Sequence, residues 1–303
     1  MKKISLHIYI VLGIFLIGFI VGSFVDLSLM ESLFSENNTF GLVLSVIGTM
    51  PGYGCLAILG GGMFAMALKK DEFSIPYRFI FYVLMATGLV TSIFFAGREF
   101  FGVNGFSGAA PEWVGYLIAL PVMAGLFYLG YRIAIKSDNN RLWVLMIVLM
   151  IAIFIALVPG VTALKSIFHR PRYRIVVRYG YEEFHNWWQR CTNYKDILAT
   201  TNVGKDEFKS FPSGHVGAAS VFMLCAAFLP LVNSKYERIQ LPIFYVGLAW
   251  SLLIAFSRIL VGAHFLSDVS MGGMLTTICL IVAYYVVMKG KLGLPKVEQP
   301  QAE

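Results

Sequence analysis

The chain has 303 residues, of which 58% are hydrophobic and 14% charged, whereas soluble domains average about 45–50% apolar and about 25% charged residues. This balance excludes an ordinary soluble domain and indicates a polytopic membrane protein. The formal net charge of +7 does not indicate a nucleic-acid partner, because the basic residues interrupt apolar runs instead of gathering on a polar face. The four cysteines show neither a disulfide framework nor zinc spacing.

Eight apolar runs are long enough to cross about 30 Å of hydrocarbon as helices. The first follows Lys2 and Lys3 and lacks the cleavage site of a signal peptide, so we expect it to be a span. The predicted fold class is therefore an all-α polytopic membrane protein with eight spans. They cover residues 4–25, 41–68, 77–97, 113–135, 142–164, 214–234, 241–258 and 265–288.

The distribution of lysine and arginine between the connections orients these spans. With the N-terminus inside, the short outer connections hold only Arg98 and Arg258, and the first outer loop, 26–39, is acidic. We therefore expect a multi-pass protein of the cell membrane with both termini cytoplasmic, including a tail at 289–303. The basic residues assigned to the inside are Lys2, Lys3, Lys69, Lys70, Arg78, Arg132, Lys136, Arg141, Lys235, Arg238, Lys289, Lys291 and Lys296.

The outer loop 165–212 departs from this rule, because it carries nine lysines and arginines. An anionic ligand would explain them, since guanidinium groups bind phosphate oxygens with paired hydrogen bonds. The alternative is a loop long enough to be translocated regardless of charge. Four aromatic residues of this loop could form an interfacial helix or a lid packed on the protein: Tyr181, Phe184, Trp187 and Trp188.

The segment from Ser257 to Asp268 brings a cation, an imidazole and a carboxylate to one membrane boundary. His264 and Asp268 are four residues apart, so on a helix they share one face. The carboxylate could accept the Nδ1 proton of the imidazole and leave Nε2 as an oriented nucleophile. The alternative is a helix-end histidine paired with an acid near the membrane surface. Ionisable groups within spans are costly, which favours a functional role.

Two further groups lie at the same predicted boundary. Pro212, Ser213 and Gly214 open the sixth run, where free amides of a first helical turn can bind an anion. His215 follows them and could act as a general acid, although an ordinary helix cap also explains the serine and the glycine. Three cations, Lys165, Arg172 and Arg258, could neutralise a phosphoryl group; a lysine that merely reaches the membrane surface is the alternative for Lys165.

These residues resemble the type 2 phosphatidic acid phosphatase (PAP2) family, also called the lipid phosphate phosphatase and vanadium haloperoxidase superfamily. Its three signatures read Lys-x6-Arg-Pro, Pro-Ser-Gly-His and Ser-Arg-x5-His-x3-Asp. The second and third are matched in full by 212–215 and 257–268. The first is matched by Lys165 and Arg172 in spacing, but Tyr173 replaces the proline and an extra Arg170 precedes it. Both arginines remain candidates, and the spacing favours Arg172.

The resemblance covers roughly residues 77–288, as a six-helix phosphatase core, and leaves 1–76 as an added N-terminal pair of spans. It implies a metal-independent phosphatase without cofactors, whose active site faces the outside. In this family the nucleophile would be His264, its orienting carboxylate Asp268 and the general acid His215. The implied phosphate ligands are Lys165, Arg172, Ser213, Gly214 and Arg258.

The implied substrate is an anionic lipid: phosphatidate, phosphatidylglycerol phosphate or a polyprenyl diphosphate such as undecaprenyl diphosphate. Three alternatives stay open. Two histidines and a carboxylate also form the facial triad of non-haem iron sites, although three nearby cations would repel the metal. A lipid phosphotransferase would use the same residues, and a non-catalytic lipid-binding protein could keep the fold. The sequence does not rank the lipids or reveal the oligomeric state.

Overall fold

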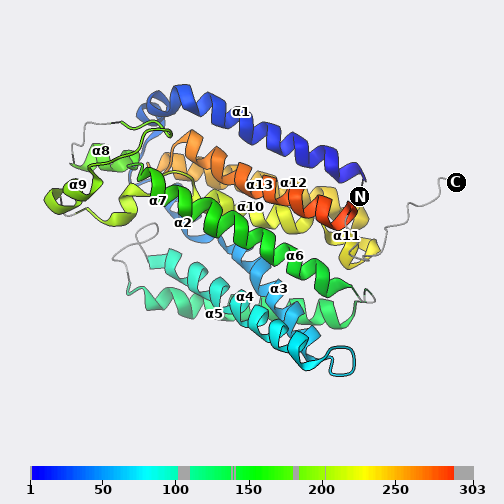
Figure 1. Cartoon of the computed structure of the whole chain (residues 1–303). Helices are drawn as coiled ribbons and strands as arrows, with labels where there is room; N and C mark the ends of the chain where they lie inside the picture. Colours follow the sequence, from blue (N-terminus) through cyan, green and yellow to red (C-terminus); the bar gives the residue numbers. More distant parts are fainter. Residues whose placement is uncertain are drawn as a thin grey trace.

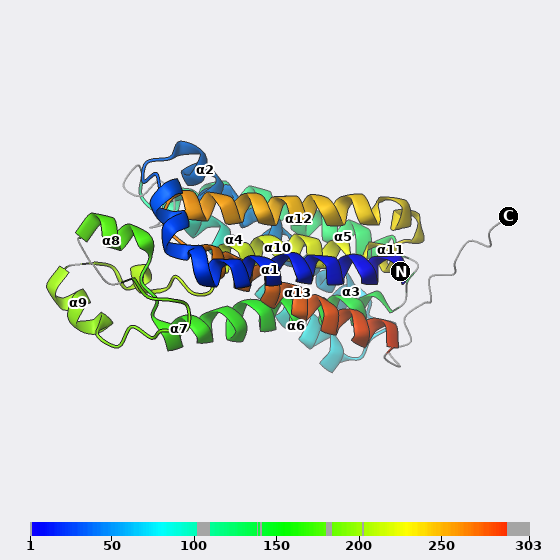
Figure 2. The same cartoon turned by 90° about the horizontal axis from the view of Figure 1, so that it is seen from above.

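The computed structural model describes residues 2–101, 110–137, 139, 141–179, 184–201 and 203–289. Throughout this part of the chain, all regular secondary structure is helical. The long helices lie side by side in a bundle (Figures 1 and 2). The all-α class predicted from the sequence is thereby confirmed.

Seven helical segments of the described chain are long and apolar enough to cross a membrane. Each of the seven corresponds to an apolar run identified in the sequence. Such runs form helices because a backbone exposed to lipid must make its hydrogen bonds within the segment. Their helices are α1 (Lys2–Leu33), α2 (Thr39–Ile47) with α3 (Met50–Leu68), α4 (Ile75–Phe101), α5 (Trp113–Ile135), α6 (Leu142–Ile155) continued by the π-helix η1 (Ala156–Ala163) and α7 (Leu164–Phe168), α12 (Glu237–Leu260) and α13 (Leu266–Lys289).

The eighth expected span, 214–234, forms a shorter element. It folds into α10 (Gly214–Ala226), which has 13 residues, and α11 (Leu229–Val232), and it is followed by the 3-10 turn η3 (Ser234–Tyr236). α10 is almost entirely buried and contacts α12, α13 and α3. The count of eight spans is therefore not confirmed by helix length, because α10 lies inside the bundle and faces protein instead of lipid.

The first two membrane segments pack against different partners. α1 lies along α13, whereas α3 packs against α4 and α5. Figure 1 shows α3, α4 and α5 on one side of the bundle and α1, α12 and α13 on the other. The N-terminal segments are thus distributed over the bundle, and α1 lies beside the helix that follows His264.

Two helices extend further than the apolar runs indicated. α1 continues to Leu33, so Asp26 lies within a helix and is 3% exposed, which corrects its expected place in an outer loop. α4 continues to Phe101 and includes the buried Glu99. Hydropathy ended both runs early because each carboxylate lowers the local average, while partners elsewhere in the chain accommodate the charge inside the protein.

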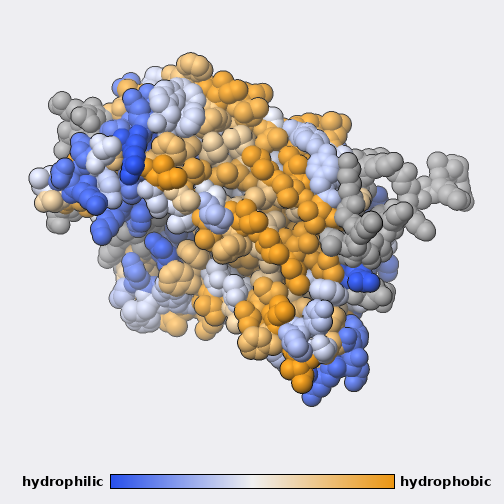
Figure 3. Space-filling view, in the orientation of Figure 1, coloured by the Kyte–Doolittle hydropathy of each residue, from blue (hydrophilic) through white to orange (hydrophobic). Residues whose placement is uncertain are grey.

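The surface is divided along the bundle axis. On the face shown in Figure 3, hydrophobic residues cover the middle, and hydrophilic residues gather towards the two ends. α1 begins and α13 finishes at one end, and the segment between α7 and α10 lies at the other (Figure 1). That segment contains α8 (Tyr173–Tyr179), α9 (Tyr194–Thr201) and the 3-10 turn η2 (Lys205–Phe208).

The aromatic part of this segment packs on the bundle. Residues 184–188 are not helical, and Trp187 Nε1 donates a 2.9 Å hydrogen bond to Ser23 Oγ on α1. The Trp187 ring stacks on Phe211 at a centroid distance of 5.7 Å, and Phe184 contacts Phe265. These contacts agree with the lid interpretation. Tyr181 and the tail beyond Lys289 lie outside the described residues.

Candidate active site

His264 lies in the connection between α12 and α13, and its side chain is 1% exposed. The chain turns at Gly262, whose φ of +66° is in the left-handed region that favours glycine. A Cβ at this position would also lie 2.5 Å from Phe34 Cε2. The turn therefore needs glycine, and it sets the position of His264 just before α13.

The two nitrogens of His264 have different surroundings. Nδ1 lies 2.7 Å from the backbone carbonyl oxygen of Ser210. Because a carbonyl can only accept, Nδ1 is the protonated nitrogen, and Nε2 keeps its lone pair. Nε2 has no hydrogen-bond partner among the described residues. Burial, reinforced by the cations Arg172 and Lys165, lowers the pKa of His264 well below its usual value, so the ring is neutral.

Asp268 contacts His264 less directly than the spacing of four residues suggested. Its Oδ2 lies 3.9 Å from His264 Nδ1, beyond a hydrogen bond. Oδ2 instead accepts from the Phe265 amide at 2.9 Å and from the Ser210 hydroxyl. The reason is that α13 begins at Leu266, so His264 is not on the helix and does not share its face. Asp268 thus holds Ser210, and Ser210 holds the imidazole.

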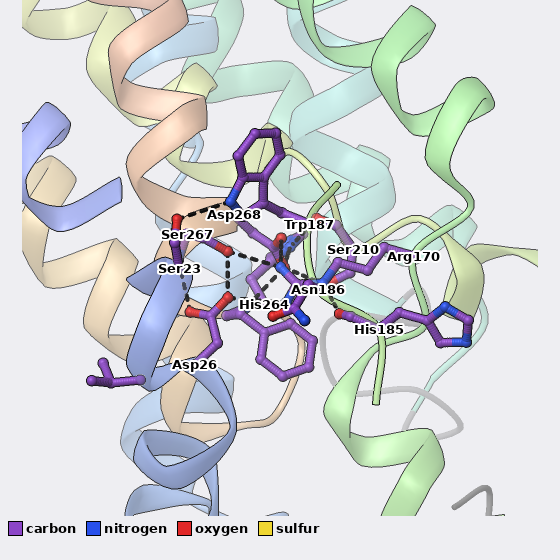
Figure 4. A network of polar contacts seen from close by, with 12 residues as sticks. Ser23, Asp26, Arg170, His185, Asn186, Trp187, Ser210, His264, Ser267 and Asp268 are labelled. Carbon is purple, nitrogen blue, oxygen red and sulfur yellow. Dashed lines mark hydrogen bonds and ion pairs between the residues drawn. The ribbon is translucent and has the colours of Figure 1, made fainter. Parts of the chain in front are cut away.

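Arg170 binds the other oxygen of Asp268. Its Nη1 donates a 2.6 Å hydrogen bond to Asp268 Oδ1, and its Nη2 donates a 2.9 Å hydrogen bond to Asp26 Oδ2 on α1. Figure 4 shows these groups converging beside His264. Arg170 is completely buried and does not line the cavity described below. Of the two candidate arginines, this one is hydrogen-bonded to two carboxylates and lies away from the cavity.

His215 faces His264 from the first turn of α10. The ring centroids of the two histidines are 6.3 Å apart. Ser213 is the N-cap of α10, where its hydroxyl accepts from the Val216 amide at 3.4 Å. His215 Nε2 lies 3.2 Å from Oε2 of Glu99, which projects from α4. A buried carboxylate therefore accompanies the candidate general acid.

A cavity of about 720 Å³ opens in front of His215. One end is polar and carries three cationic side chains of the segment between α6 and α10, namely Lys165, Arg172 and Lys209. The Cβ position of Gly214 would lie 3.5 Å from Lys165 Nζ, so the ammonium group approaches the start of α10. Arg172 Nη1 is 3.9 Å from Glu207 Oε1. Arg98 and the carboxylates of Glu99 and Asp206 also line the cavity. Its polar end thus joins a helix N-terminus to several positive charges, of which Arg98 and Lys209 pair with Asp206.

The remainder of the cavity is mostly apolar, with a few hydroxyl side chains in its lining. Its walls come from α3, α4, α6 and the π-helix η1, which are all membrane segments. Because a π-helix has a wider turn, it changes which residues face the same side of a helix. Residues of η1 line the cavity. The apolar lining comprises Tyr53, Leu56, Leu84, Phe95, Met150, Ile151, Ile153, Phe154, Leu157, Val158 and Val161.

The predicted site residues therefore form two layers. Lys165, Arg172, Gly214 and His215 line the cavity. The others lie behind this lining and are fully or almost fully buried: Ser213, Arg258, His264 and Asp268. In this second layer, Arg258 Nη1 donates a hydrogen bond to Ser45 Oγ of α2, and the Ser213 amide donates a 2.9 Å hydrogen bond to the Asp268 carbonyl.

Internal ion pairs occupy several loop cations that the sequence had associated with an anionic ligand. Arg174 pairs with Glu207, and Arg178 pairs with Glu36. Lys209 Nζ lies 2.7 Å from Asp206 Oδ1. The excess of positive charge in 165–212 is thus a less direct sign of a ligand than it appeared in the sequence. Only part of it faces the cavity.

Three residues of this site were missed at the sequence level: Asp26, Glu99 and Ser210. Asp26 and Glu99 each follow an apolar run by no more than two residues, so they were assigned to connections. Their signal was an acidic residue at the edge of a membrane segment, which indicates a functional role by default. Ser210 acts mainly through its backbone carbonyl, for which side-chain patterns hold no signal.

Residues 141–291 match the family model of the PAP2 superfamily. The chain contains a PAP2 superfamily domain. The matched segment includes every site residue predicted from the sequence, whereas Asp26, Ser45 and Glu99 lie outside it. Members of this superfamily are generally metal-independent phosphatases. No solved structure matches the chain significantly.

Proposed function

We propose that the chain is an integral membrane lipid phosphatase that removes a terminal phosphate from an anionic lipid through a phosphohistidine intermediate. The observation that carries this proposal is the shape of the cavity, which joins a cationic end beside His215 to an apolar arm among membrane helices. Ligand sites of this kind are mostly apolar with a few convergent polar groups. A phosphate headgroup matches the first end, and a hydrocarbon chain matches the second.

In the first step, Nε2 of His264 attacks phosphorus, and the bond between phosphorus and the lipid oxygen breaks. His215 donates its proton to that departing oxygen. Lys165 and Arg172 neutralise the charge on the remaining phosphoryl oxygens, as fixed cations do in phosphoryl transfer. The hydrogen bond from Nδ1 to the Ser210 carbonyl keeps the ring oriented while Nε2 carries the phosphoryl group.

In the second step, water attacks phosphorus and the bond to Nε2 breaks. His215, now neutral, takes a proton from the water, and inorganic phosphate leaves. The histidine pair thus serves as nucleophile and as acid then base. Arg172 is the arginine we assign to the phosphate, because it lines the cavity, while Arg170 is held by two carboxylates. Ser213, Gly214 and Arg258 complete the proposed phosphate-binding set; Gly214 lines the cavity, whereas Ser213 and Arg258 lie directly behind its lining.

We further propose that α10 and α11 together make an eighth crossing, since the stretch 214–232 would reach about 28 Å at the rise of a helix. The helix ends near the N-terminus would then be cytoplasmic and the site extracytoplasmic, as the distribution of lysine and arginine indicates. The division into 1–76 and a core at 77–288 is part of this proposal. Phosphatidate, phosphatidylglycerol phosphate and undecaprenyl diphosphate are the candidate substrates.

The test is phosphate release by the detergent-purified protein in EDTA from each of the three lipids. His264→Ala is run beside wild type, and His7→Ala is the matched control, because His7 lies at the far end of α1 and bonds to Tyr245. We expect release that survives chelation, is lost in His264→Ala and persists in His7→Ala. A folded wild-type protein that releases phosphate from none of them would refute the hydrolase. Phosphate recovered on a second lipid would identify a transferase.

A further inference from the structure

A completely buried arginine lies behind the proposed nucleophile and is shared between the two ends of the chain. Arg170 is bound by Asp26 of α1 and by Asp268 of α13. The two carboxylates are 242 positions apart in numbering, and only the second belongs to the segment that matches the PAP2 superfamily. The helix α1 therefore contributes directly to the surroundings of the site.

All three guanidinium nitrogens of Arg170 donate hydrogen bonds within this inner cluster. Nε donates to the His185 carbonyl at 2.8 Å, and Nη1 also donates to Ser267 Oγ at 2.9 Å. The guanidinium carbon lies 4.0 Å from the ring centroid of Phe265, which closes one face of the group. Arg170 thus has no orientation in which it reaches the cavity without breaking these contacts. Its position fixes Asp268.

Asp26 is bound as specifically as Arg170. Its Oδ1 accepts from the Ser267 amide at 3.0 Å, and its Oδ2 accepts from the Ser267 hydroxyl. One turn earlier on α1, a Cβ at Gly22 would lie 2.5 Å from the Ser267 amide nitrogen, so glycine is required for this close approach. The carboxylate of α1 is consequently held against the first turn of α13.

We infer that Asp26 is a positioning residue for the nucleophile His264. The influence passes through Arg170 to Asp268, whose other oxygen holds the Ser210 hydroxyl. The Ser210 carbonyl then accepts the Nδ1 proton of His264. This inference rests on the proposed phosphatase function and extends it, because it assigns a role to a helix outside the matched domain.

The charges explain why removal of Asp26 would matter. One guanidinium balances two carboxylates, so Asp268 shares Arg170 and retains an oxygen for Ser210 and the Phe265 amide. In Asp26→Asn, Asp268 is the only carboxylate that still pairs with the buried cation among the described residues, and the attraction draws it towards Arg170. The Ser210 carbonyl and the imidazole then shift. A displacement of about 1 Å at a reacting group costs about 100-fold in rate.

The experiment measures kcat and KM for phosphatidate in Asp26→Asn and in the matched control Glu31→Gln. Glu31 is an exposed acid on the same helix, close to Asp26 in sequence. We expect kcat to fall by about 10- to 100-fold in Asp26→Asn, with KM within about threefold of wild type because Asp26 does not line the cavity. Glu31→Gln keeps both constants. In an Asp268→Asn background, Asp26→Asn has no further effect on kcat.

A second variant covers the case in which Asp26→Asn does not fold. Ser267→Ala removes one hydroxyl from the cluster and keeps every charge, and we expect kcat to fall by about three- to tenfold at unchanged KM. Wild-type kcat in whichever of these variants is folded would overturn the inference, as would a loss confined to KM. A wild-type protein without phosphatase activity would instead refute the proposed function, so the two failures are distinguishable.

Discussion

Glu99 offers a sharp test of the proposed acid, because it lies 3.2 Å from His215 Nε2 and projects from a helix outside the matched domain. In Glu99→Gln a neutral amide of similar size replaces the carboxylate. We take the ion pair with a protonated His215 to be comparable to a hydrogen bond to a charged group, which contributes about 1.5–3 kcal/mol, and each 1.4 kcal/mol is a factor of ten. Since the carboxylate stabilises the protonated imidazole, we expect kcat/KM for phosphatidate to fall by about 10- to 150-fold.

The assay compares two leaving groups. kcat/KM reports the steps up to formation of the proposed phosphohistidine, and only a poor leaving group would need a proton from His215 in those steps. Phosphatidate releases an alkoxide, whereas p-nitrophenyl phosphate releases a stable phenolate. We therefore expect Glu99→Gln to change kcat/KM for p-nitrophenyl phosphate by less than about threefold. Glu112→Gln, at an exposed position before α5, serves as the control.

An equal loss of kcat/KM on both substrates would refute this reasoning, because it would mean that Glu99 supports the structure or the binding of phosphate. The combination with His215→Asn adds a second criterion. If Glu99 acts through His215, Glu99→Gln costs nothing further once the imidazole is absent. If Glu99→Gln instead lowers kcat/KM by its full factor in the His215→Asn background, the two residues act independently.

Three more predictions concern the cavity and the loop beside it. Arg172→Lys keeps the charge but loses the planar fork, so kcat/KM for phosphatidate should fall by about 10- to 100-fold, as steady-state kinetics can measure; unchanged kinetics would exclude Arg172 as a phosphate ligand. Leu157→Trp fills the apolar arm, and kcat/KM should fall more for dioleoyl than for dihexanoyl phosphatidate; equal losses would contradict a hydrocarbon site there. Burial raises the pKa of the Glu207 carboxyl, but the Arg174 hydrogen bond and nearby arginines outweigh burial, so the pKa lies below its usual value. The resulting stabilisation of the folded state is complete above the unfolded pKa of about 4.3 and is lost as the pH falls through the lower folded pKa. The thermal unfolding temperatures of Glu207→Gln and wild type should therefore differ at pH 7 and converge in acid. A difference that persists in acid would contradict this explanation.

Local patterns in the sequence predicted much of this architecture. Apolar length placed the seven long membrane segments, because the hydrocarbon thickness imposes it on every crossing. The signature spacings identified Lys165, His215 and His264 as candidates, and the structure brings them to one end of the bundle. Chemically distinctive residues at short, fixed spacings can be recognised without knowledge of the tertiary fold.

The remainder depended on contacts between distant segments. Nothing near Asp26 in the sequence indicates that Arg170 will neutralise it, and nothing near Glu99 indicates His215. The expected bond between His264 and Asp268 was replaced because the helix begins two residues after the histidine, and helix boundaries are uncertain by that amount from sequence alone. α10 is shorter than the expected span at 214–234, because a helix enclosed by protein does not need the length of one that faces lipid.

The ion pairs between α1 and the later segments also have a consequence for biosynthesis. α1 precedes Arg170 and Asp268 in the chain, so during synthesis its carboxylate meets them only after most of the residues between have been made. During that interval Asp26 resides in the membrane without those partners, at a cost of up to about 2.5–3.5 kcal/mol on insertion scales. Docking of α13 relieves this cost and assembles the surroundings of His264 in the same event. A nascent chain that stalls before α13 therefore lacks these ion pairs, and the proposed hydrolytic activity would appear only after α13 has inserted.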